Sequence, residues 1–389
     1  MNPAENVDRA FVVDLLKDLV ATNSVNPTVG RGPGESALSN LIYDRLASIK
    51  GLDVRRQPVA DGRSNVIGIL TGSGGGRSLM LNGHMDTVGV EGMMIQPFRP
   101  FIENGKLHGR GACDMKGALA AMIGAVKSLI DSGSSLPGDL IFSAVVDEEY
   151  KSIGTKKLLE EYRADAAIVG EPTEMRVATA HKGSVWIEVE TKGRAAHGSV
   201  PEKGVDAILH AAKVASRIEE LQERLESRVH PLLGSPKIHT STIEGGTDWS
   251  IVPERCVLRL ERRTLPGESV GFVMAEIEEI LQRIKHENAD FNATARSTYD
   301  MPPLETAPAE TIVKLLRQAL VDKTERGAPV IGVPYWTDGA LLSNLASIPT
   351  CIFGPGDIGV AHSADEYIGV DDVLDSGEVY RSIAERFCS

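Results

Sequence analysis

The chain has 389 residues, of which 42% are hydrophobic, and its formal net charge is −13 at pH 7. This surplus of negative charge argues against nucleic acid or an anionic membrane surface as a partner. The length exceeds what one ordinary hydrophobic core supports, so two domains are expected.

The terminal residues and the cysteines bear on where the protein works. Residues 1–8 are polar and acidic, without the basic and apolar segments of a secretion signal, and no apolar run approaches membrane-spanning length. The four cysteines are scattered and include no Cys-x-x-Cys pair, which favours reduced thiols. We therefore expect a cytoplasmic protein.

The first part of the chain alternates between two kinds of pattern. Apolar residues recur at helical spacing in residues 38–46 and 119–130. Strand-like apolar runs occupy residues 66–70, 78–83, 141–146 and 166–170. This alternation is typical of an α/β domain. The glycine-rich residues 72–76 lie between two strands and not before a helix, which favours a turn over a phosphate-binding loop.

From His181 onward the pattern changes. Residues 185–190 alternate as a half-exposed strand does, and residues 205–218 have the spacing of a long amphipathic helix. A further strand and helix follow at 257–260 and 273–284 before helical patterning restarts at 311–320. We predict one domain built from residues 1–180 and 297–389, with a smaller α+β domain, residues 181–296, inserted in it.

Three of the apolar runs lead directly into residues that can bind a metal ion. Residues 78–83 run into His84, residues 141–146 are followed by Glu148 and Glu149, and residues 166–170 end at Glu171. In open α/β sheets, ligands collect at the carboxyl ends of the strands. A single histidine is usually a surface or core residue and an acidic run is usually a solvated loop, but this repeated placement favours a site.

The chemistry of a two-metal site suits these residue types. Imidazole nitrogen and carboxylate oxygen are ligands that zinc prefers where no thiolate is offered. Paired ions lie about 3.5–4 Å apart and often share a carboxylate, which suits Asp114 with its short stem. Asp86 lies two residues after His84, so it could accept the second ring N–H of that histidine. Of Glu148 and Glu149, one can bind metal while the other faces the attacking water.

Six segments spread over most of the chain carry a family resemblance. They include Asn-Gly-His-Met-Asp-Thr-Val at 82–88 and Gly-Glu-Pro-Thr at 170–173; the others are residues 109–117, 147–149, 193–199 and 354–362. Together they resemble the zinc-dependent family of acetylornithine deacetylase, succinyl-diaminopimelate desuccinylase, aminoacylase and carboxypeptidase G. The resemblance implies a mixed-sheet α/β zinc-hydrolase catalytic domain with an inserted α+β lid or dimerisation domain.

The resemblance also implies a set of metal ligands. His84 and Glu171 would hold one zinc ion, Glu149 and His362 would hold the other, and Asp114 would bridge the two. The peptide bond after Asp114 would be cis. Cobalt or manganese could replace zinc, because such ligands discriminate poorly between these metals.

Catalytic roles follow from the same resemblance. Glu148 would be the general base, which takes a proton from the attacking water and returns it to the leaving amine. Asp86 would support the metal ligand His84. His197 would donate a hydrogen bond to the oxyanion, often across a subunit boundary, which implies a homodimer.

Three further residues are candidates for binding substrate. Ser250 stands where many relatives have asparagine, which puts that role in doubt. Arg263 could make a two-point contact with a substrate carboxylate, or instead form a surface ion pair with Glu261. Asp338 lies in a Thr-Asp-Gly segment that resembles the desuccinylase-like members.

The function that we predict from these residues is a di-zinc metallohydrolase that cleaves the amide bond of a small N-acyl amino acid. A metallo-carboxypeptidase or dipeptidase of the same family is the alternative. A zinc aminopeptidase would need an acidic subsite for a free amine, and none is evident apart from the metal ligands. A non-catalytic metal-binding relative should have lost the base, whereas Glu148 is present.

Overall fold

One mixed sheet organises the larger part of the chain in the computed structural model, which describes residues 6–324 and 326–389. In this described part the strand order is β1-β2-β6-β3-β7-β15-β8-β13, and β14 pairs with β8. The central strands β6, β3, β7 and β15 pair in parallel, whereas β1–β2, β2–β6 and β15–β8 are antiparallel. The strands are β1 (Asp53–Ala60), β2 (Arg63–Leu70), β3 (Leu79–His84), β6 (Leu140–Val145), β7 (Ala166–Val169), β8 (Val177–His181), β13 (Leu304–Glu305), β14 (Val330–Val333) and β15 (Thr350–Ile352).

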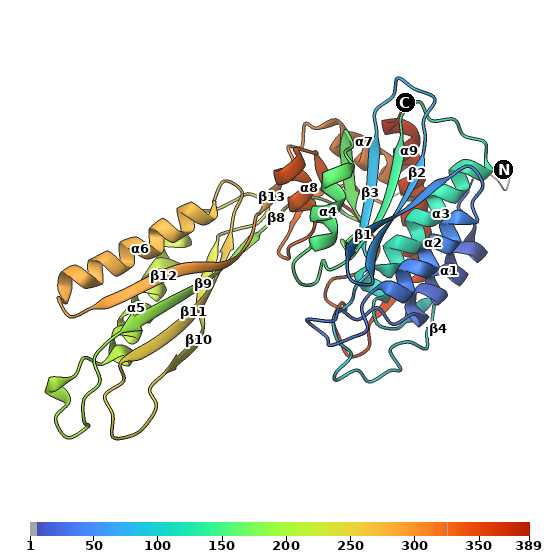
Figure 1. The fold of residues 1–389 in the computed structure, drawn as a ribbon. Coiled ribbons are helices and arrows are strands. Elements are labelled where there is room, and N and C mark those ends of the chain that lie inside the picture. Colours follow the sequence, from blue (N-terminus) through green and yellow to red (C-terminus); the bar gives the residue numbers. More distant parts are fainter. Residues whose placement is uncertain (1–5, 325) are drawn as a thin grey trace. The chain divides into compact units, whose positions relative to one another are not determined.

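Helices pack beside this sheet in two groups. Figure 1 shows α1 and α3 on one side of the strands and α4 and α8 on the other. In one group α1, α3, α7 and α9 pack on one another; in the other, α4 packs against α8. The helices are α1 (Arg9–Ala21), α2 (Ser36–Ala47), α3 (Gly117–Asp131), α4 (Ile153–Glu161), α7 (Thr311–Thr324), α8 (Gly339–Ala346) and α9 (Val370–Phe387). A small sheet adds β4 (Phe101–Glu103), β5 (Lys106–His108) and β16 (Tyr367–Gly369).

The central strands are buried along their whole length. Every residue of β3 and β6 is buried, as expected for parallel strands that are covered on both faces. The continuous apolar runs predicted as strands at 78–83 and 141–146 are confirmed as β3 and β6. The predicted α/β class is therefore also confirmed.

The chain divides into two compact units. The first consists of Met1–Thr179, Thr306–Ile331 and Thr337–Ser389, and the second of Ala180–Glu305 and Gly332–Trp336. The second unit continues beyond the expected limit at residue 296 because β12 (Asn292–Met301) pairs with β9 (Gly183–Lys192) almost to its end. The indole Nε1 of Trp336 donates to Pro302 O at 2.9 Å within this unit.

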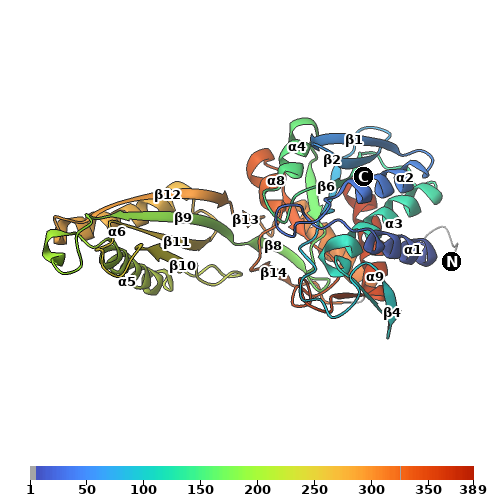
Figure 2. The ribbon, with the colours of Figure 1, turned by 60° about the horizontal axis from the view of Figure 1, so that its bottom comes forward.

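The second unit is an antiparallel sheet covered by two helices. Its strand order is β10-β11-β9-β12, with α5 and α6 packed along it (Figure 2). The remaining bounds are β10 (Lys237–Gly245), β11 (Arg255–Thr264), α5 (Ala207–Leu225) and α6 (Val270–Glu287). The predicted alternation in β9 is confirmed, because Val185, Ile187 and Val189 are buried in the core whereas Trp186 is exposed.

Side chains at the starts of α5 and α6 explain where these helices begin. Asp206 accepts a hydrogen bond from Leu209 N, and Ser269 accepts one from Phe272 N, so each helix has an N-cap.

Among the helices of residues 6–324 and 326–389, none combines the length and hydropathy needed to cross a bilayer.

Candidate metal centre

Parallel pairing brings three strand ends to one edge of the large sheet. His84, the last residue of β3, lies opposite Val145 of β6, and Asn82 lies opposite Val169 of β7. The loops that follow β6 and β7 carry Glu148, Glu149 and Glu171. Strand register therefore delivers a histidine and three glutamates to the same edge. These lie where the apolar runs of the sequence end.

The other two candidate ligands come from separate segments of the first unit. Asp114 lies in the turn Ala112–Lys116, directly before α3, and its own φ of −121° and ψ of 95° are not helical. The Asp114–Met115 peptide bond is cis, as the family resemblance implies. His362 lies between β15 and β16 and has a φ of 59°, a left-handed conformation that turns the chain sharply.

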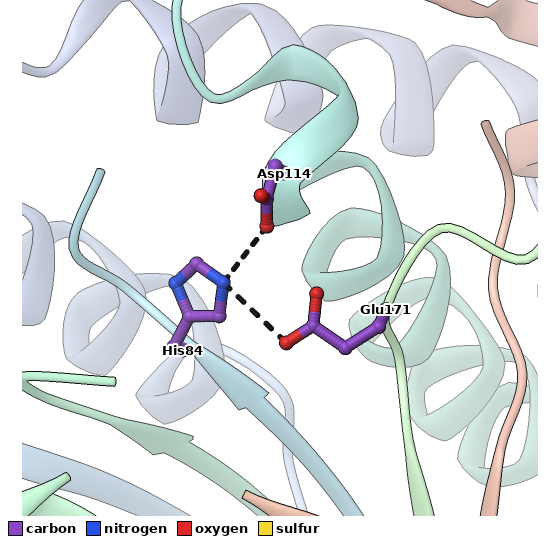
Figure 3. A group of neighbouring side chains, drawn as sticks. All are labelled: His84, Asp114 and Glu171. Carbon is purple, nitrogen blue, oxygen red and sulfur yellow. Dashed lines mark hydrogen bonds and ion pairs between the residues drawn. The ribbon is translucent and has the colours of Figure 1, made fainter. Parts of the chain in front are cut away.

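The five candidate ligands form two groups that share one residue. His84 Nε2 lies 2.9 Å from Asp114 Oδ1 and 3.6 Å from Glu171 Oε1, and Figure 3 shows these three side chains pointing toward one another. His362 Nε2 lies 3.1 Å from Asp114 Oδ2 and 3.3 Å from Glu149 Oε1. Asp114 thus takes part in both groups, with a different oxygen in each.

The two groups differ in their access to solvent. His84, Asp114 and Glu171 are buried. The side chain of His362 is 48% exposed, while that of its partner Glu149 is 9% exposed. Solvent therefore reaches the cluster from the side of His362.

Packing acidic groups and imidazoles together shifts their pKa values strongly. Burial would raise the pKa of Asp114, but hydrogen bonds from His362 and His84 hold it well below its usual value. Hydrogen bonds to Asp114 and Glu149 raise the pKa of His362 to about 10. Burial raises the pKa of Glu171 well above its usual value, and the nearby Asp114 carboxylate adds to this.

Glu148 has the pKa shift expected of a proton-transfer group. Burial raises the pKa of its carboxyl well above the ordinary value, and the negative charges of Glu171, Asp338 and Glu149 raise it further, against the opposing effect of His84. A raised pKa in a carboxylate beside imidazole and carboxylate groups is a common feature of functional sites. The raised pKa makes this carboxylate a better proton acceptor than an ordinary glutamate, which suits a group that takes up and returns a proton.

The contact of Asp86 differs from the one expected. His84 Nδ1 lies 2.9 Å from the backbone oxygen of Asp86 but 3.7 Å from its carboxylate. The carboxylate instead accepts the backbone N–H groups of Glu148 at 3.0 Å and of Glu149 at 3.1 Å. Asp86 therefore fixes the ring of His84 through its main chain and the two glutamates through its side chain.

Glu366 is a buried residue of the site that the sequence reasoning did not identify. Its carboxylate accepts the backbone N–H groups of Gly111, Cys113 and Asp114 at 2.9–3.1 Å. Arg110 Nη1 lies 2.6 Å from the same carboxylate. Glu366 thus holds the turn that carries Asp114. The one sequence signal was an acidic residue four positions after His362.

We expect Glu366→Ala to destabilise the metal-free protein by about 3–5 kcal/mol, because it leaves the buried guanidinium of Arg110 without its partner. The free energy of unfolding in a denaturant titration checks this. Asp371→Ala is the matched control, since this carboxylate is 81% exposed and pairs with Arg9 at the surface. It should cost no more than about 1 kcal/mol. Equal losses in the two variants would contradict a supporting role for Glu366.

Asp338, a candidate for binding substrate, lies in the first unit and is buried. Its Oδ2 accepts a hydrogen bond from Thr155 Oγ1 at 2.6 Å, and burial raises its pKa. Its charge acts on Glu148. The expected contact with substrate stays a prediction.

The remaining candidates lie in the second unit. His197 and Ser250 are brought together there, because His197 forms a β-bridge with Ile251 and Gly198 N donates to Ser250 O at 2.7 Å. Arg263 Nη2 lies 2.8 Å from Glu261 Oε1, which is the surface ion pair of the alternative interpretation.

The residues of the first unit fit a pair of divalent ions. Each group offers one imidazole nitrogen and two carboxylate oxygens within 4.8 Å of one another. Nitrogen and oxygen donors of this kind suit zinc, cobalt or manganese. The fit is chemical as well as geometric, because the carboxylates Asp114, Glu149 and Glu171 concentrate negative charge in a largely buried place.

Comparisons with known proteins identify the family of the chain. The model of peptidase family M20/M25/M40 matches residues 80–386. Acetylornithine deacetylase of Proteus mirabilis (strain HI4320) is 30% identical over 393 residues, which cover 98% of each chain. N-formyl-4-amino-5-aminomethyl-2-methylpyrimidine deformylase of Bacillus subtilis (strain 168) is 32% identical over 411 residues, 97% of this chain and 95% of the relative.

The fold is similar to that of solved structures. Aminopeptidase PepT from Bacillus cereus ATCC 10987 superposes with a TM-score of 0.81 at 22% identity, covering 98% of this chain and 100% of the other. The chain therefore belongs to peptidase family M20/M25/M40, and it is a metal-dependent hydrolase.

Proposed function

We propose that this protein is a di-zinc hydrolase that cleaves the amide bond of small N-acyl amino acids. One observation carries the proposal: Asp114 offers a separate oxygen to each of two ligand groups. A shared carboxylate of this kind lets two ions act on one reaction centre. The similarity to an acetylornithine deacetylase supports an N-acyl amino acid as the substrate.

In this proposal His84 and Glu171 would hold one zinc ion, Glu149 and His362 would hold the other, and Asp114 would be a ligand in both groups. The bound ions would lower the pKa of the attacking water and polarise the scissile carbonyl. Cobalt or manganese could take the place of zinc.

The chain's own groups then move the proton and orient the reactants. Glu148 takes the proton of the water and gives it to the leaving amine. His197 donates to the oxyanion through Nε2, since its Nδ1 accepts the backbone N–H of Ser199 at 3.2 Å and the ring proton is left on Nε2. Arg263, Ser250 and Asp338 are the proposed contacts for the rest of the substrate.

A homodimer is the proposed assembly, and the second unit offers a surface for it. Strand β10 is an edge strand of its sheet, so its outer N–H and C=O groups can pair with another strand. Apolar side chains are exposed on β10 and in the segment that follows it, namely Ile243, Trp249 and Ile251. Edge pairing together with apolar burial suits a second copy of the chain.

If His197 acts across the subunit boundary, two inactive variants should complement each other. We expect Glu148→Gln and His197→Ala to be inactive alone and to recover part of the activity after mixing and subunit exchange, because one site of each mixed dimer keeps both residues. Light scattering establishes the dimer and the rate of hydrolysis reports the recovery. A fully active monomer, or full activity of His197→Ala, would reject the cross-subunit role.

A substrate panel tests the proposed reaction. Protein freed of metal with a chelator is reloaded with up to two zinc ions per chain and assayed on acetyl-ornithine, succinyl-diaminopimelate, other N-acyl amino acids, an N-formyl amide and simple dipeptides. We expect no hydrolysis without metal, and zinc-dependent hydrolysis of N-acyl amino acids. Hydrolysis of dipeptides alone would favour the peptidase alternative. Zinc binding without any hydrolysis would favour a non-catalytic relative.

A cytoplasmic location is proposed as well. Cys113, Cys256, Cys351 and Cys388 are all buried free thiols, as is usual for proteins of a reducing compartment.

A further inference from the structure

Asn26 is a fully buried amide next to the proposed site. Its Nδ2 donates to Asp86 Oδ2 at 2.8 Å and to Asp147 Oδ1 at 3.2 Å. Its Oδ1 accepts the backbone N–H groups of Thr28 at 2.9 Å and Val29 at 3.2 Å. Because two N–H donors face this oxygen, the amide can have only one orientation, with its NH₂ group toward the two carboxylates.

Both carboxylates belong to the segment that carries the proposed base. Asp86 accepts the backbone N–H groups of Glu148 and Glu149, one on each oxygen. Asp147 directly precedes Glu148 and has a φ of 71°, a conformation that a non-glycine residue adopts only when its surroundings hold it. The NH₂ group of Asn26 thus donates one hydrogen bond to Asp86 and one to Asp147. These two aspartates hold the segment that carries Glu148.

Asp147, one of the two acids that Asn26 contacts, shares a single guanidinium with Glu35. Arg63 Nη2 lies 2.9 Å from Asp147 Oδ1, and the same guanidinium makes a two-point contact with Glu35 at 2.6–2.7 Å. The contacts of this one guanidinium are therefore divided between Glu35 and Asp147, which are both buried. Asn26 adds two neutral N–H donors at the point where Asp86 and Asp147 lie close together, while His84 Nδ1 lies farther off, 3.7 Å from the Asp86 carboxylate.

We propose that Asn26 is a positioning residue that holds Glu148 and Glu149 in register through Asp86 and Asp147. The inference rests on the proposed function, in which Glu148 is the base and Glu149 a metal ligand. Loss of the amide donors lets the two carboxylates move apart, and the backbone N–H groups of both glutamates move with Asp86. The base and one ligand are then displaced together.

Two substitutions separate the donor role from simple packing. Asn26→Asp keeps the size of the side chain but replaces the donors by a third carboxylate, whereas Asn26→Ala removes the side chain. We expect kcat to fall about 10–100-fold in Asn26→Ala, as when an outer partner of a metal ligand is lost. KM should change little, and Asn26→Asp should be at least as impaired. If Asn26→Asp is the milder of the two, the amide only fills space and the inference is wrong.

Two further variants guard against general effects. Asn40→Asp makes the same chemical change on the surface of α2, where the side chain already accepts from Arg56 Nη1 at 2.7 Å, and it should leave kcat unchanged. Asn26→Ser keeps one shorter donor, so its kcat should lie between those of the wild type and Asn26→Ala. If Asn26→Asp does not fold, the comparison of kcat between Asn26→Ser and Asn26→Ala still tests the inference. Equal kcat values in these two variants would overturn it.

Cobalt binding gives a readout that does not depend on activity. Metal-free protein is titrated with cobalt(II) and followed by its visible absorption. We expect the Asn26 variants to bind one ion as the wild type does and the other about 10–100-fold more weakly, because only the group that contains Glu149 is displaced. Unchanged binding of both ions together with unchanged kcat would overturn the inference. If the zinc-loaded wild type hydrolyses no substrate, the proposed function fails while cobalt binding still tests Asn26.

Discussion

Glu148→Gln should keep two metal ions per chain and lose turnover by about 10²–10⁴-fold, the usual contribution of a general base. The amide has nearly the same size as the carboxylate, but it cannot accept a proton from water. Its backbone N–H still donates to Asp86, so the neighbouring Glu149 stays in place. The substitution thus removes proton transfer and leaves the ligand groups intact.

The measurement has to separate chemistry from metal loss. Metal content by elemental analysis and kcat on the best substrate of the panel are determined on the same preparation. Glu161→Gln, an exposed glutamate at the end of α4, makes the same chemical change away from the cluster and should leave both quantities unaltered. Unchanged kcat at full metal loading in Glu148→Gln would remove the assignment of the base.

The sequence could predict the candidate ligands because chain direction alone brings most of them to one place. His84, Glu148, Glu149 and Glu171 each follow a continuous apolar run, and the runs become parallel neighbours β3, β6 and β7. Parallel strands must end at a common edge, so local pattern was sufficient there. His362 and Asp114 needed the family resemblance, because they come from turns without periodicity.

The contacts that support these ligands could not be read from local pattern. Glu366 binds backbone groups of the turn at Asp114, which lies about 250 residues earlier in the chain. Asn26 reaches Asp86 and Asp147 across similarly unrelated segments. Such hydrogen bonds depend on tertiary packing and leave no periodic signal in the sequence.

The expected role of Asp86 shows where a local rule stops. Side chains two residues apart point the same way only while the strand continues, but β3 ends at His84. Beyond that point the carboxylate accepts the half-buried backbone N–H groups of Glu148 and Glu149. The backbone oxygen of Asp86 is left to accept the ring N–H of His84.

Asp114→Asn should abolish the binding of both metal ions at concentrations that saturate the wild type. The amide keeps the shape of the side chain but is neutral, and an uncharged amide binds divalent ions much more weakly than a carboxylate, so both His84's group and His362's group lose their shared charged ligand. Loss of a shared ligand should lower the affinity for each ion by more than the roughly 10–100-fold that is lost when an outer partner of a ligand is removed. Metal content per chain after equilibrium dialysis measures this, and hydrolysis should fall with it.

His362→Ala is the informative comparison, because it removes a ligand that only one group uses. We expect this variant to keep the ion bound by His84 and Glu171, which are buried and lie within 3.6 Å of each other, and to lose the other ion. If His362→Ala retains one ion and Asp114→Asn retains none, Asp114 serves both groups. If Asp114→Asn and His362→Ala each lose a single ion, the two groups bind metal independently. The shared-carboxylate geometry would then not be the basis of the reaction.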